Sequence, residues 1–105
     1  MRICLSTLPV DCAERIATTL LAERLVACVN LLGPLESRYW WDGAIQTDQE
    51  IMLLLKTHDD LTTRLIERLR ELHPYEVPEI VIIPVEFVSP PYLAWVDAQT
   101  LPARG

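Results

Sequence analysis

Hydrophobic and polar positions along this chain change their period several times, and each change marks the boundary of a predicted element. The mostly apolar residues 2–8 predict a strand. Asp11 stands three residues before Glu14, the spacing of a capping box, which predicts that the Asp11 carboxylate caps a helix over residues 11–24. Apolar side chains recur at helical spacing on one face of this segment: Ala13, Ile16, Ala17, Leu20 and Leu21.

A long hairpin is predicted next. Residues 27–33 predict a strand that pauses at a Gly-Pro pair and resumes over residues 35–42. The Asp-Gly dipeptide that follows is a hairpin turn signal, and residues 44–57 form the return arm. This arm alternates weakly in its first half and is continuously apolar in its second, which predicts a strand exposed at one end and buried at the other.

The second half of the chain opens with leucines at helical spacing: Leu61, Leu65, Leu69 and Leu72. They predict a helix that Asp59 or Asp60 caps and that a His-Pro pair ends, because the residue before a proline disfavours helical backbone. Residues 80–88 predict a final apolar strand, in which Pro84 marks a bulge or a sheet edge because it cannot donate a ladder hydrogen bond.

A proline pair predicts a short last helix over residues 91–98, and the tail over residues 99–105 is expected to be loose. The order is therefore strand-helix-strand-strand-helix-strand with an extra C-terminal helix. This order predicts an α+β protein with a ferredoxin-like βαββαβ sandwich, in which four antiparallel strands carry two helices on one face. The length predicts a single domain over residues 1–105.

The hairpin arms are longer than the last strand can cover, so the hairpin tip is expected to project past the helices. The tip carries three adjacent aromatic residues, Tyr39, Trp40 and Trp41. Three exposed aromatics on a strand pair would be an aggregation hazard. We expect another copy of the chain to cover them; the alternative is that one or two fold back onto their own domain.

Composition narrows the classes of partner. The net charge of −6 disfavours nucleic acid and anionic membrane surfaces, because an acidic surface repels phosphate. No apolar stretch approaches the roughly 18–20 residues that a membrane span needs. Three cysteines without CxxC spacing, and a start without signal-peptide architecture, predict reduced thiols in a cytoplasmic protein.

The segment over residues 73–79 holds the densest chemistry of the chain. It offers an imidazole, a phenol and two carboxylates, from His73, Tyr75, Glu76 and Glu79, and two prolines stiffen it. Imidazole with carboxylate suits copper or zinc, so His73, Glu76 and Glu79 are candidate metal ligands. The alternative, which spacing alone favours, is a rigid connector in which His73 caps the carbonyl groups of the preceding helix.

No catalytic machinery is predicted. The serines lie in no GxSxG elbow, and the chain has too few glycines for a phosphate cradle. Glu76 and Glu79 form a carboxylate pair, but nothing nearby defines a substrate pocket. Lys56, the sole lysine, could neutralise an anion or pair with Glu50 across subunits; the alternative is a solvated strand end.

Several motifs occur together in a fixed order. They are Ile-Ala followed by Leu-Val-Ala-Cys-Val-Asn within residues 16–30, Ser-x-Tyr-x-Trp-x-Gly over 37–43, Glu and Lys-Thr within 50–57, His-Pro-Tyr-Glu-Val-Pro-Glu-Ile over 73–80, and Tyr-Leu-Ala-Trp over 92–95. In these motifs the chain resembles the CutA divalent-cation-tolerance family over roughly residues 3–95.

The resemblance implies a ferredoxin-like protomer assembled as a stable, PII-like homotrimer, in which the long hairpins pair across subunits and clefts form at the subunit boundaries. It also implies a non-enzymatic role in tolerance of divalent cations, copper especially, without an organic cofactor. His73 is then the foremost candidate ligand for Cu²⁺, assisted by Glu76 and Glu79. Some members carry a copper-binding cysteine where this chain has Ser6, which weakens the case for a Cu(I) site; Cys4 is a displaced substitute.

The resemblance further implies that Trp41, Glu50, Lys56 and Tyr75 line or support the cleft between subunits. Ser6, Tyr39 and Trp40 are expected at the same cleft or at the trimer interface. Two other functions stay open. One is a PII-like sensor that binds a small anionic ligand in the cleft, with charge from Lys56 and Arg38; the other is a structural trimer that serves as a docking platform.

Overall fold

An antiparallel sheet of four strands, in the order β2-β3-β1-β4, organises residues 1–101, the part of the chain that the computed structural model describes. The strands are β1 (Arg2–Pro9), β2 (Cys28–Trp41), β3 (Ala44–Thr57) and β4 (Val81–Pro84). The helices are α1 (Val10–Ala22), the 3-10 helix η1 (Asp59–Leu61), α2 (Thr62–Leu72) and α3 (Pro90–Gln99). This arrangement confirms the α+β, ferredoxin-like fold with an extra C-terminal helix.

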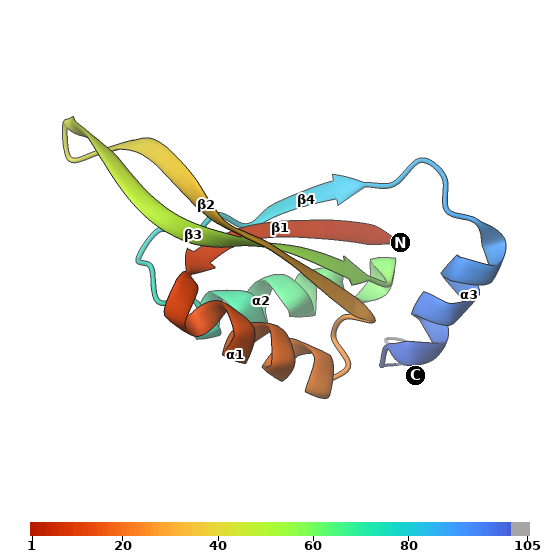
Figure 1. The fold of residues 1–105 in the computed structure, drawn as a ribbon. Coiled ribbons are helices and arrows are strands. Elements are labelled where there is room, and N and C mark those ends of the chain that lie inside the picture. The colour runs from red at the N-terminus through yellow and green to blue at the C-terminus, as the bar shows by residue number, and fades with distance from the viewer. Residues whose placement is uncertain (102–105) are drawn as a thin grey trace.

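The core lies between the sheet and the helices α1 and α2, which cover one face of the sheet (Figure 1). Strand β1 sends its alternate residues Cys4, Ser6 and Leu8 into this layer, and all three are fully buried. The apolar stripe of each helix completes the layer, with side chains that include Ile16, Leu20, Leu65 and Leu69. Each large apolar side chain buried in this way stabilises the fold by about 1.5–3 kcal/mol.

The opposite face of the sheet is also apolar, and no helix of the described chain covers it (Figure 1). Leu5 lies opposite Leu54 of β3 on one side and Val81 of β4 on the other, and Ile3 lies opposite Ile83. Directly opposite residues point to the same face of a sheet, so these side chains form one continuous apolar surface. Val81 and Ile83 are exposed on it, and the other three are half-buried.

The hairpin of β2 and β3 projects beyond the rest of the sheet, as the sequence predicted (Figure 1). Strand β1 pairs with β3 only from Glu50 to Thr57, so residues 44–49 of β3 pair with β2 alone. Trp40 and Trp41, near the tip, are 72% and 50% exposed. Trp40 therefore does not fold back onto its own domain, whereas Trp41 partly does, because it lines a cavity together with residues of the segment that follows α2.

The pause predicted at the Gly-Pro pair is a bulge within one continuous strand, where the register shifts between Leu32 and Leu35. Gly33 has φ of +126°, a conformation that side chains with a Cβ rarely adopt. A Cβ at Gly33 would also lie 2.7 Å from the Leu35 nitrogen and 3.0 Å from the Glu50 carbonyl oxygen. Glycine thus lets β2 bend closely over β3.

Both predicted helix caps are wrong. Helix α1 begins at Val10, directly after Pro9, and no side chain caps it. Asp11 consequently falls inside the first turn, where its charge is favourable for the helix dipole. At the second helical segment the cap is His58, whose Nδ1 accepts the N–H of Asp60 at 3.0 Å, and Asp59 lies within η1.

The last strand is shorter than predicted, because β4 ends at Pro84 rather than at residue 88. Phe87 is 78% exposed, so the apolar run continues outside the sheet. The expectation of a loose tail is wrong for residues 99–101: Thr100 is buried, and the Leu101 N–H donates to the Arg24 carbonyl at 2.9 Å. Residues 102–105 lie outside the described residues. Within residues 1–101, every helix is too short or too polar to cross a membrane.

We predict that Gly33→Ala destabilises the protein by about 2 kcal/mol or more, because it adds both backbone strain and a clash with Leu35 and Glu50. Gly43→Ala is the matched control. Gly43 has φ of +76°, but a Cβ there meets nothing within 4 Å, so we expect a loss of only about 1 kcal/mol. Urea unfolding at equal protein concentration measures both; equal losses would contradict the role of the close approach.

Candidate functional site

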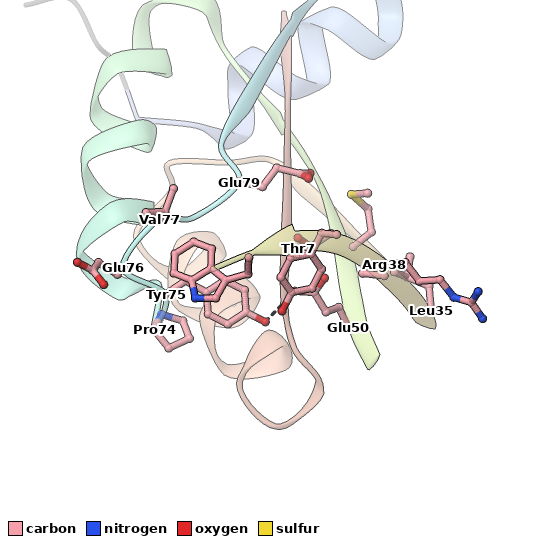
Figure 2. Close-up of a pocket in the computed structure, with 13 residues that line it drawn as sticks. Thr7, Leu35, Arg38, Glu50, Pro74, Tyr75, Glu76, Val77 and Glu79 are labelled. Atoms are coloured by element: carbon pink, nitrogen blue, oxygen red, sulfur yellow. Dashed lines mark hydrogen bonds between the residues drawn. The ribbon is translucent and has the colours of Figure 1, made fainter. Parts of the chain in front are cut away.

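A cavity of about 700 Å³ lies where the hairpin leaves the sheet, between β2, β3 and the connector that joins α2 to β4 (Figure 2). The connector comprises residues 73–80. Side chains from both sides of the cavity carry its chemistry: Tyr39, Trp41 and Glu50 from the hairpin, and Tyr75, Glu76 and Glu79 from the connector. The cavity therefore brings together two segments that the sequence separates by more than twenty residues.

Glu50 is a carboxylate held inside the protein, with only 5% of its surface exposed. It lies on β3 opposite Pro9, where β1 ends. The phenol of Tyr75 donates a hydrogen bond to Glu50 Oε2 at 2.7 Å (Figure 2). Burial, followed by this bond to the carboxylate, raises the pKa of Tyr75 well above its ordinary value, so the phenol keeps its proton and stays a donor.

His73, the first residue of the connector, is buried and does not line the cavity. Its Nε2 is 2.9 Å from the Thr7 carbonyl oxygen, and its Nδ1 accepts the backbone N–H of Tyr75 at 3.2 Å. Because a carbonyl can only accept, the proton of the neutral ring is on Nε2. Burial lowers the pKa of His73 from its ordinary value of 6.5, which favours this neutral form.

The predicted metal ligands do not converge within one protomer. Glu76 and Glu79 both line the cavity, but their side chains point in opposite directions, Glu76 away from the Glu50–Tyr75 pair (Figure 2). His73 is absent from the lining, and both of its nitrogens have protein partners. Within residues 1–101 no group of three His, Cys, Asp or Glu side chains is placed to hold a metal ion.

Ser6, predicted at the cleft between subunits or at the trimer interface, does not line the cavity of the protomer. It is fully buried on the helix side of β1, and its Oγ has no hydrogen-bond partner within the described chain. Cys4 faces the same core, and burial raises the pKa of its thiol to about 11. A neutral thiol is a poor ligand for copper, so the structure gives no support to Cys4 as a substitute.

Of the other predicted cleft residues, Lys56 and Trp40 lie outside the cavity lining. Lys56 is near the far end of β3, where its Nζ donates to Asn30 Oδ1 at 2.7 Å. Trp40 lines a smaller hollow at the hairpin tip. Tyr39 does line the main cavity, and its phenol donates to the Asp48 carboxylate.

Thr7 is a site residue that the sequence analysis did not single out. Its side chain lines the cavity, while its carbonyl oxygen binds His73. Strand alternation could have placed the side chain, since Ser6 before it is in the core. The bond to His73 had no signal in the sequence, because it involves a backbone group.

The charge of the lining is negative. Glu50, Glu76 and Glu79 contribute three carboxylates, and Arg38 is the one cationic side chain in the lining from residues 1–101. The Arg38 guanidinium lies 3.3 Å from the Glu36 carboxylate on the same strand, so part of its charge is compensated there. A cavity of this charge attracts cations in preference to anions.

The neutral state of His73 predicts an acid sensitivity that the variant His73→Gln should lack. Above pH 6.5 the ring is neutral in both the folded and the unfolded chain, and its contribution to stability is complete. As the pH falls below 6.5, the unfolded chain binds a proton on His73 before the folded chain does, so the free energy of unfolding decreases. Urea unfolding at neutral and mildly acidic pH compares the two proteins, and equal acid losses would contradict this.

Comparisons with a family profile, with related sequences and with solved structures all identify the same protein family. Residues 2–99 match the profile of the family described as CutA1 divalent ion tolerance protein. The divalent-cation tolerance protein CutA of Pyrococcus horikoshii is 48% identical over 92 residues, which cover 86% of this chain and 87% of that protein. Protein CutA of Mus musculus is 44% identical over 84% of this chain, which spans only 50% of the mouse protein.

The likeness extends to solved structures. The PII-like protein CutA from Nostoc sp. PCC 7120, in apo form, matches with a TM-score of 0.93 and 41% identity, covering 96% of this chain and 98% of that chain. The match to a PII-like protein agrees with the order of strands and helices described above. These findings confirm the family resemblance read from the sequence motifs: the chain belongs to the CutA1 divalent ion tolerance family.

Proposed function

We propose that this protein is a homotrimer that acts in divalent cation tolerance. It binds a divalent cation, with copper(II) as the preferred candidate, in the cavity between the hairpin and the connector. The observation that carries the proposal is the Glu50 carboxylate, which is almost fully buried and lies in an acidic cavity. Carboxylate oxygens are ligands for divalent cations, and a charged carboxylate is costly to bury without a counter-charge. A cation in the cavity would supply that charge.

The candidate ligands differ in part from those predicted by sequence. Glu76 and Glu79 line the cavity, so they stay candidates alongside Glu50. His73 would have to give up a hydrogen bond to reach a metal ion, so Glu50 takes its place in the proposal. Because the described residues of one protomer form no complete ligand set, a neighbouring copy or water would have to complete it.

The trimer is supported by two surfaces that a lone protomer leaves in water. One is the apolar face of the sheet around Leu5 and Leu54, and the other is the projecting hairpin with Trp40 and Trp41. Uncovered apolar patches of this kind mark interaction sites. The proposed activity is binding without catalysis, and the three free thiols support a reducing location, the cytoplasm.

A small anionic ligand is the second candidate, and the cavity volume favours it. About 700 Å³ is far more than one ion needs and lies within the range of small-molecule sites. Arg38 would supply the positive charge. Lys56, the other predicted partner, lies outside the lining, and three carboxylates oppose an anion, so the divalent cation is preferred.

Titration calorimetry of the metal-free protein with Cu(II), and with Zn(II) and Mg(II) for comparison, tests the proposal. We expect saturable copper binding that Glu50→Gln weakens by about tenfold or more, because the amide removes the charge but keeps an acceptor for Tyr75. Glu36→Gln is the matched control, since Glu36 is exposed on the same hairpin. Undiminished affinity in Glu50→Gln, or binding of organic anions but not of cations, would overturn the proposal.

A further inference from the structure

Two carboxylates of the cavity lining come from opposite sides of the cavity and stay apart. Glu50 lies on β3, whereas Glu79 lies in the connector, two residues before β4 begins. Thr7 lies between them in Figure 2, and Met52, directly opposite Thr7 in the sheet, lines the same floor. Metal ligands must converge to within about 2.6 Å of one point, and within residues 1–101 no group of three His, Cys, Asp or Glu side chains does so. Separate negative charges around one cavity fit instead a ligand whose positive charges are spaced along a chain.

The Glu50 carboxylate has no counter-charge within residues 1–101. Its one hydrogen bond there comes from the neutral phenol of Tyr75, and it takes part in none of the ion pairs of that region. The guanidinium of Arg38 is paired with Glu36 and points away from Glu50 (Figure 2). Because a buried charge is costly until it is paired, a ligand that brings a positive charge to Glu50 gains more there than at an exposed carboxylate.

The walls of the cavity suit an organic cation. Three aromatic and three aliphatic side chains contribute to the lining: Tyr39, Trp41, Tyr75, Leu35, Met52 and Val77. Aromatic faces attract ammonium groups through the cation–π interaction, and aliphatic side chains pack against methylene groups. The volume of about 700 Å³ lies within the range of small-molecule sites, so a chain of methylene and amine groups would use space that a single metal ion leaves open.

We infer that the cavity binds an aliphatic di- or polyamine, with one ammonium group on Glu50 and another on Glu79. Each ammonium donates charge-assisted hydrogen bonds to its carboxylate, and the methylene groups between them cross the floor over Thr7 and Met52. The ring of Trp41 covers the chain from the hairpin side. The inference concerns the same cavity as the proposed function, but it does not require a metal ion to bind.

Titration calorimetry of the metal-free protein with spermidine, a linear triamine, tests the inference at about 150 mM salt, which screens general attraction to an acidic protein. We expect saturable binding that Glu50→Gln and Glu79→Gln each weaken by about tenfold or more, because each removes a charged hydrogen bond. Glu79 is exposed, so its substitution tests the site without disturbing the core. Trp41→Leu should weaken binding by about two- to fivefold through loss of the cation–π contact. Glu67→Gln is the matched control with unchanged affinity, because it removes one exposed charge on α2 outside the cavity lining.

Amines that differ only in their charges test the spacing. Butylamine has the carbon chain of the diamine putrescine but a single ammonium group, so we expect it to bind about tenfold more weakly than putrescine or less tightly still. Absence of saturable spermidine binding, equal affinity for putrescine and butylamine, or equal affinity in Glu50→Gln and Glu67→Gln would overturn the inference. Copper binding by protein that does not bind spermidine would overturn the inference and leave the proposed function intact, and spermidine binding without copper binding would do the reverse.

Discussion

The sheet has two apolar faces, and the helices of one protomer can cover only one of them. Helices α1 and α2 bury the face that carries Cys4 and Leu8, whereas Ile3, Leu5 and Leu54 line the other face and have no covering helix within residues 1–101. Burial of such a face is a large favourable term in association.

The cavity forms at the point of the sheet where β1 ends and the hairpin of β2 and β3 continues without it. Strand β1 stops at Pro9, opposite Glu50, while β2 and β3 continue outward. The connector crosses the space that β1 leaves, and Tyr75 covers Glu50 there. The Gly33 bulge brings β2 close to the Glu50 backbone carbonyl oxygen. The Glu50 side chain is buried although it lies near the end of the main sheet.

Sequence patterns predicted those features that depend on side-chain character repeated along an element. The alternation in residues 44–57 predicted a strand that is half exposed, and the hairpin has that form. The patterns failed at the helix starts: Pro9 leads directly into α1, and the imidazole of His58 rather than an aspartate caps η1. The role of His73 was hidden because its two partners are backbone groups, a carbonyl and an N–H.

The central claim is that copies of this chain cover the bare face of the sheet. Sedimentation equilibrium of the metal-free protein at micromolar concentration tests it most directly, because it measures the mass of the assembly without reference to shape. The account predicts a single species of about 36 kDa, three times the 12.0 kDa chain. A stable 12.0 kDa monomer under the same conditions would contradict it, because the apolar face around Leu5 would then lie in water.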